Sequence, residues 1–109
     1  MSEVRITGSE APDGLTLRTS GLAARGLPEL RAAGLPPYLG QGWARVLGLL
    51  AQRLAAADRG VQEIDLTPDV TVRLVPAGAG WLEPAPPPGE DAAVWRRDVL
   101  LRLFPEANT

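Results

Sequence analysis

The chain has 109 residues, of which 45% are hydrophobic and 5% aromatic, and its formal net charge is −2 at pH 7. These values predict one folded domain over residues 1–109 with enough apolar side chains for a core. They exclude a strongly basic protein. Because the basic residues form no stripe along the sequence, we expect no nucleic-acid partner.

Motifs for enzymatic chemistry are missing from the sequence. It contains no phosphate-binding loop with its lysine, no dinucleotide-binding glycine pattern, no metal-protease motif and no nucleophile elbow. All basic residues are Arg, and neither His nor Cys occurs. These absences remove the usual general bases, covalent nucleophiles and transition-metal ligands. We therefore expect a non-enzymatic protein with no catalytic residues, no cofactor and no metal site.

The sequence also bears on location and source. Its first residues, MSEVRITGSE, contain no apolar segment typical of a signal peptide, and no apolar run reaches the roughly 18 residues of a transmembrane helix. The sequence thus predicts a cytoplasmic protein with no membrane partner. The exclusive use of Arg and the abundance of Ala, Gly and Pro indicate a GC-rich bacterial genome.

The first third of the chain predicts a hairpin followed by an irregular segment. Residues 3–7 and 15–19 alternate apolar and polar side chains on either side of a long loop, residues 8–14, in which Asp13-Gly14 is the clearest turn marker. This pattern favours an antiparallel hairpin. Residues 20–35 do not continue this pattern. We expect short helical turns and extended pieces there, because four residues interrupt regular structure: Gly21, Gly26, Pro28 and Gly34.

Residues 36–58 carry the longest helical pattern, and we expect this helix to organise the core. Two prolines suit its first turn, and Gly60 is expected to cap its end. One apolar stripe recurs every three or four positions: Leu39, Trp43, Val46, Leu47, Leu50, Leu54 and Ala57. A flank of small residues predicts close approach of another backbone, unless it reflects composition alone: Gly40, Ala44, Gly48, Ala51 and Ala55.

The last third predicts a second hairpin, a linker and a second helix. Residues 61–66 and 70–75 alternate around the turn sequence Thr67-Pro68-Asp69. Residues 83–89, EPAPPPG, predict an extended Pro-rich linker, and residues 90–104 predict a helix. The expected fold is therefore α+β, with one mainly antiparallel sheet of about four strands in two hairpins. The long central helix packs on this sheet, and the C-terminal helix follows the linker.

The predicted C-terminal helix is apolar on more than one side. One side carries Ala92, Val99 and Leu103 and is extended by Leu100 and Phe104. Val94 and Leu101 point almost the opposite way. A helix of this kind is normally covered on more than one side. We predict a candidate interface for a homodimer or another protein, formed by Trp95, Val94, Leu101, Phe104 and Arg97. The alternative is that the Pro-rich linker folds back over the exposed side.

The predicted function is a protein-interaction module, either dimerising, adaptor or immunity-type. The alternative is a small-molecule-binding or enzymatic domain with a pocket between the sheet and the helices. Trp43, Trp81 and Trp95 serve either as core residues or as interface or pocket residues.

Three smaller groups of residues are candidates for ligand binding or catalysis. For each of them a structural role is favoured. Asp65 and Asp69 form an acid–base pair or cation site, or they cap the turn between the second pair of strands. Arg96 and Arg97 beside Trp95 bind an anion, or they form a solvated helix face with an Arg stem packed over Trp95. For the segment Pro36-Pro37-Tyr38, burial at the helix start is favoured over a proline-rich ligand motif.

Overall fold

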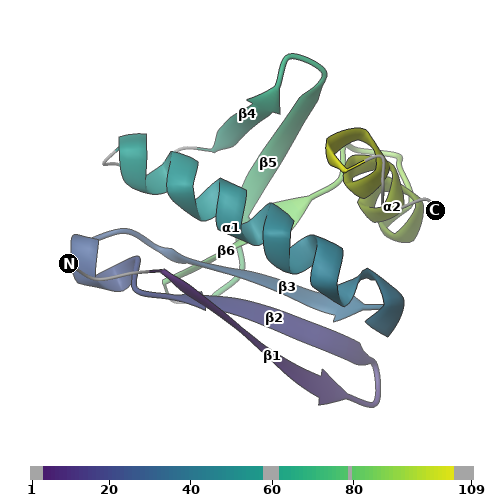
Figure 1. Cartoon of the computed structure of the whole chain (residues 1–109), viewed down its shortest axis with the longest axis horizontal. Coiled ribbons are helices and arrows are strands. Elements are labelled where there is room, and N and C mark those ends of the chain that lie inside the picture. Colours follow the sequence, from purple (N-terminus) through teal and green to yellow (C-terminus); the bar gives the residue numbers. More distant parts are fainter. Residues whose placement is uncertain (1–3, 58–61, 79, 105–109) are drawn as a thin grey trace.

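The computed structural model describes residues 4–57, 62–78 and 80–104. Two consecutive units of three strands and a helix form the fold (Figure 1). The first unit contains β1 (Arg5–Ala11), β2 (Gly14–Ser20), the 3-10 turn η1 (Ala23–Arg25), β3 (Glu29–Leu35), the 3-10 turn η2 (Pro37–Leu39) and α1 (Gly40–Ala57). The second contains β4 (Glu63–Thr67), β5 (Val70–Pro76), β6 (Trp81–Ala85) and α2 (Ala92–Leu103).

The six strands of the described chain form one mixed sheet in the order β1-β2-β3-β6-β5-β4. Four of the neighbouring pairs are antiparallel, and the central pair, β3 with β6, is parallel. The predicted α+β class is therefore confirmed. The prediction of about four strands in a mainly antiparallel sheet is corrected to six strands in a mixed sheet, because two further segments pair at the centre.

The first of these segments is β3, which lies in the region predicted to be irregular. Leu30 and Ala32 face the core and alternate with Arg31 and Ala33, so the strand pattern is present but short. Gly34 adopts a positive φ of 69°, which is a conformation that glycine adopts readily. This residue bends the end of β3 so that Leu35 also turns into the core.

The second segment is β6, which includes the first three residues of the predicted linker 83–89. Glu29 N donates to Gly80 O and Ala77 N donates to Trp81 O, both at 3.0 Å. Main-chain polar groups of even-numbered β6 residues therefore point toward β3. Pro84 has no N–H to offer β3, and the registered pairing of β3 with β6 ends at Leu82. A proline is tolerated in this central strand because the pairing has stopped.

The core lies between the sheet and one side of α1. Leu47, Leu50 and Leu54 are fully buried, as the helical pattern predicted. Pro37 begins η2, which leads directly into α1, so the proline-rich start of the predicted helix is also confirmed. Ala57 is exposed rather than part of the buried stripe, and the cap expected at Gly60 lies outside the described residues.

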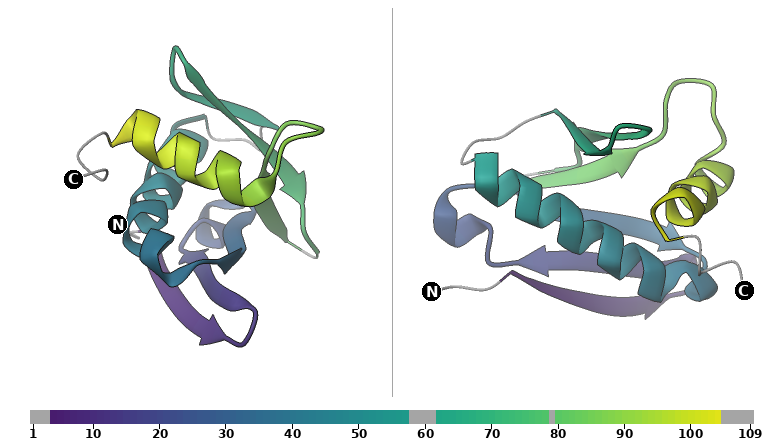
Figure 2. Two further views of the ribbon diagram at one scale, coloured as in Figure 1. Left: turned by 90° about the vertical axis from the view of Figure 1, so that its right-hand side faces the viewer. Right: turned by 45° about the horizontal axis from the view of Figure 1, so that its top comes forward.

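Both helices lie on the same side of the sheet (Figure 2). α1 crosses the first three strands and contacts β4, while α2 packs against α1 and β5. In the described residues, no helix covers the opposite face, which we call the open face. Strand alternation places these residues on it: Thr7, Thr16, Arg18, Arg31, Trp81, Glu83, Arg73, Thr71, Glu63 and Asp65.

Candidate functional site

α2 begins with a capped first turn that fixes where the helix starts. The carboxylate Oδ1 of Asp91 accepts hydrogen bonds from Ala93 N at 2.9 Å and Val94 N at 3.1 Å. This is the N-cap arrangement in which a side-chain oxygen satisfies unpaired helix donors. Asp91 thus lies just before the helix rather than inside its first turn, and the described helix ends at Leu103.

Two tryptophans join α2 to α1. The rings of Trp43 and Trp95 lie 5.7 Å apart between centroids and are tilted by 49°, and both side chains are buried. Trp43 Nε1 donates to Arg96 O at 3.0 Å. The two helices are therefore connected by an aromatic contact and a hydrogen bond at the same place.

Arg96 joins α2 to the end of β3. Its Nη2 donates to Ala33 O at 2.8 Å and its Nη1 donates to Gly34 O at 3.1 Å. Burial lowers the pKa of the Arg96 guanidinium, and the negative charge of Glu83 acts against this shift. The guanidinium nevertheless stays charged, as arginine does in proteins. It supplies donors for β3 carbonyls beyond the last registered pair with β6.

The two helices pack closely at a glycine outside the predicted small-residue flank. A Cβ at Gly42 would lie 3.0 Å from Leu100 Cγ and still closer to both of its methyl groups. The predicted flank gives a mixed result. A Cβ at Gly40 would meet the Leu15 side chain at 2.5 Å, whereas a Cβ at Gly48 would meet nothing within 4 Å. Side chains rather than another backbone thus account for the close packing.

We expect Gly42→Ala and Gly48→Ala to change stability in opposite directions. Each gains about 1 kcal/mol of helix propensity. At Gly42, overpacking against the buried Leu100 costs about 1–3 kcal/mol, which outweighs that gain over most of its range. At Gly48, no neighbouring atom within 4 Å opposes the gain in helix propensity. Thermal unfolding of both variants decides this, and a Gly42→Ala protein as stabilised as Gly48→Ala would contradict the close contact.

One side of α2 remains uncovered in the described structure. Val94, Arg97, Leu101 and Phe104 fall within an arc of about 80° at 3.6 residues per turn. Val94 is 53% exposed, Arg97 is exposed, and Leu101 and Phe104 are partly exposed. We call these four residues the outer stripe. Buried Trp95 and Val99 lie on the other side of the helix.

The outer stripe borders a groove between α1 and α2. The groove has a volume of about 630 Å³ and is lined by Tyr38, Leu39, Gln41, Gly42, Arg45, Arg97, Leu100 and Leu101. Tyr38, which is 78% exposed, lies on the α1 side of this groove. The Arg45 guanidinium lies 3.7 Å from the centre of the Phe104 ring, which is a cation–π distance. Apolar surface and two arginines thus form one concave area.

The structure brings together four of the five residues predicted for the interface. Val94, Leu101, Phe104 and Arg97 share the outer stripe, whereas Trp95 is 6% exposed and packs in the core. The prediction that Tyr38 is buried at the start of the helix is wrong, because its side chain is exposed. Leu39, the last residue of η2, turns inward, and the neighbouring Tyr38 points outward.

The other candidate groups have structural partners. Asp65 Oδ1 accepts the Thr71 hydroxyl at 2.6 Å across the β4–β5 hairpin. Asp69 N donates to Thr67 Oγ1 at 3.3 Å, and Asp69 O accepts from Arg102 Nη1 at 3.5 Å. Within the described ranges, no three Asp or Glu residues are placed to hold a metal ion.

Two of the remaining cavities also lie near the sheet. One of about 290 Å³ lies between the β4–β5 turn and α2, where Asp69, Glu90, Asp98 and Arg102 give it a charged lining. It lies at the lower limit of volumes typical of small-molecule sites. The other, of about 530 Å³, lies at the ends of the strands and is lined by Pro28, Gln62, Glu63, Arg73, Leu74, Val75, Pro76 and Leu82.

Fold and surface define a two-layer α+β protein with a groove between its helices and an uncovered sheet face. No protein-family model, no curated protein and no solved structure matches the chain. Among the described helices, none has the length and apolar character needed to cross a membrane.

Proposed function

We propose that the protein is a non-enzymatic interaction module that associates with a second copy of itself through the outer stripe of α2. The observation that carries this proposal is the continuous area formed by the outer stripe, the groove and Tyr38. Tyr38 and Val94 are the large apolar residues most exposed in the described chain. Tyr38 lines the groove, and Val94 belongs to the outer stripe. Contiguous apolar surface next to a groove is typical of protein interaction sites.

An antiparallel two-fold arrangement of α2 suits this surface. Centred near Asp98 and Val99, it places Val94 against the partner's Phe104 and Arg97 against the partner's Leu101. Two-fold symmetry is the commonest closed form of self-association and uses the same surface on both copies.

The Pro-rich segment does not compete for this surface in the described residues. Pro87 lines the cavity beside Trp95, Asp98 and Val99, on a different side of α2. The groove is lined instead by residues of η2, α1 and α2. The folded-back linker therefore leaves the outer stripe open to a second copy.

We also propose a source and a location, and the composition supports both. We place the module in the cytoplasm of a bacterium, because the Arg-only basic set fits GC-rich coding and a chain without Cys needs no oxidising compartment.

Val94→Glu should abolish self-association. The substitution places a carboxylate in an apolar contact that recurs twice in a two-fold dimer, so each complex contains two buried charges. Light scattering after size-exclusion chromatography, over low to high micromolar concentrations, measures the mass. The wild-type mass should rise toward twice 11.5 kDa, and the Val94→Glu mass should not.

Ala92→Glu is the matched control. Ala92 is also exposed and lies in the first turn of α2, but it is outside the outer stripe. Its variant should dimerise as the wild type does. A wild-type protein that stays at 11.5 kDa at every concentration would remove the proposal. A dimer that Val94→Glu leaves unchanged would place the interface elsewhere.

A further inference from the structure

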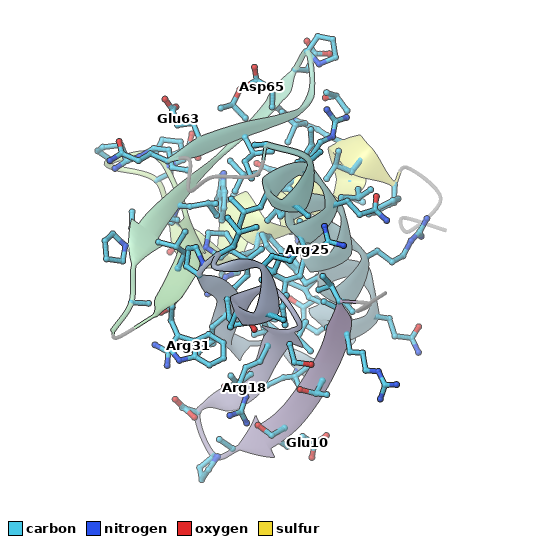
Figure 3. All side chains as sticks on the ribbon, turned by 90° about the vertical axis from the view of Figure 1, so that its left-hand side faces the viewer. Glu10, Arg18, Arg25, Arg31, Glu63 and Asp65 are labelled. Atoms are coloured by element: carbon cyan, nitrogen blue, oxygen red, sulfur yellow. The ribbon has the colours of Figure 1, made fainter. Side chains whose placement is uncertain are left out.

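The open face of the sheet carries two arginines directly opposite each other. Arg18 on β2 is registered with Arg31 on β3 in an antiparallel pair, and both side chains point to the open face (Figure 3). Side chains in such positions are neighbours, with Cβ atoms roughly 5 Å apart, and like charges there destabilise a sheet. A hairpin selected for stability alone would place an acidic or neutral residue at one of these positions.

Arg31 is held in place by three contacts. Its Nη2 bonds to Glu83 Oε1 at 3.2 Å and donates to Ala77 O at 3.0 Å. Its guanidinium carbon lies 5.9 Å from the centre of the Trp81 ring. The fixed orientation lowers the entropy lost when this guanidinium binds a further group.

Arg18 is less neutralised than Arg31. Its Nη2 donates to Ser9 Oγ at 3.2 Å, and no carboxylate in the described part of the chain forms an ion pair with it. Glu29 also belongs to this end of the face, but its carboxylate is occupied. It accepts hydrogen bonds from the backbone N–H groups of residues 21, 22 and 23 and from the Thr19 hydroxyl.

We propose that Arg18 and Arg31 bind an oxyanion, carried on a flat ring that lies against Trp81. Guanidinium groups present paired donors that match the oxygens of a phosphate or carboxylate. Trp81 is partly exposed beside Arg31, on the strand next to β3 on the side away from Arg18, and offers an apolar surface for the ring. The bound anion separates the two positive charges, which explains why the sheet retains them opposite each other. Glu83 on β6 already bonds to Arg31, so the oxyanion binds on the Arg18 side of the Arg31 guanidinium and the ring extends across Arg31 toward Trp81.

The test titrates the full chain with phenyl phosphate, benzoate and phenol at low ionic strength. The Nε–H signals of the arginines and the indole N–H signals of the tryptophans are followed by NMR. Phenyl phosphate or benzoate should shift Arg18, Arg31 and Trp81 together and saturably, at millimolar concentration or below. Phenol should shift none of the three saturably, because it carries the ring without the oxyanion. Whichever anion binds more tightly identifies the phosphate or carboxylate class of the natural ligand.

Arg18→Gln separates a ligand site from a structural pair. It should weaken anion binding at least tenfold, while raising the melting temperature without ligand by about 1–5 °C because like-charge repulsion is lost. Arg5→Gln is the control, since Arg5 is exposed on the neighbouring strand and its side chain points to the same face. It should change the affinity less than threefold.

Three outcomes would overturn the proposal. The first is the absence of saturable shifts at Arg18 and Arg31 with either anion. The second is binding that survives Arg18→Gln. The third is an equal loss in Arg5→Gln, which would indicate a diffuse positive potential instead of a site. None of these readings depends on whether the chain is a monomer or a dimer.

Discussion

Trp43→Ala should lower the free energy of unfolding by about 3–5 kcal/mol. Trp43 is fully buried, contacts the Trp95 ring and donates a hydrogen bond to Arg96 O. The substitution leaves a large cavity at the junction of α1 and α2 and removes the donor for that carbonyl. Urea denaturation at one fixed protein concentration measures the change, because self-association would otherwise add to the apparent stability.

Trp81→Ala provides the comparison for the same chemical change at a partly exposed site. Trp81 lies on the open face, so less apolar surface is lost and no closed cavity forms. We expect a loss of about 1 kcal/mol or less. If the two tryptophan variants lost equal stability, the placement of Trp43 in the core and of Trp81 on the open face would be wrong.

Leu50→Ala should cost about 2–5 kcal/mol. The side chain is fully buried in the centre of α1, where sheet residues surround it on the core side. Gln52→Ala is the control on the same helix, since Gln52 is exposed and alanine has the higher helix propensity. It should change stability by no more than about 0.5 kcal/mol. A Leu50→Ala protein that unfolds together with the control would contradict the assigned core face of α1.

The elements with long, regular patterns could be predicted from the sequence. α1 has a buried stripe at helical spacing, and the hairpin of β4 and β5 has alternating β-branched residues around a proline-containing turn. Both patterns arise from local geometry, in which one side of the element is buried and the other is solvated. The tertiary structure is consistent with both of these local patterns.

The two central strands could not be predicted in the same way. β3 is preceded by Pro28 and contains Gly34, and β6 contains Pro84. These residues are typical of loops and edges, so the local signal opposed the strand assignment. Interactions with distant parts of the chain permit these residues in the two strands. β3 and β6 have only two registered pairs, and Arg96 supplies donors to β3 carbonyls beyond that point.

The candidate interface was predictable in part. The apolar residues on two sides of α2 indicated that one side needs a further partner. Spacing placed Val94 and Leu101 together, but it assigned Phe104 to the side that carries Val99. The position of Tyr38 was not available from spacing, because it depends on how η2 turns before α1. Nor did the sequence reveal that Arg18 and Arg31 are opposite, since strand register depends on pairing between β2 and a strand that local signals did not indicate.

The short parallel junction at the centre of the sheet also divides the folding of the chain. Within each unit the strands are neighbours in sequence and form by short loop closures, whereas Arg31 and Glu83 are 52 residues apart. During synthesis the first unit leaves the ribosome before β6 exists, and β3 then presents an unpaired strand edge. The chain is thus most vulnerable to aggregation in the interval between completion of α1 and arrival of β6.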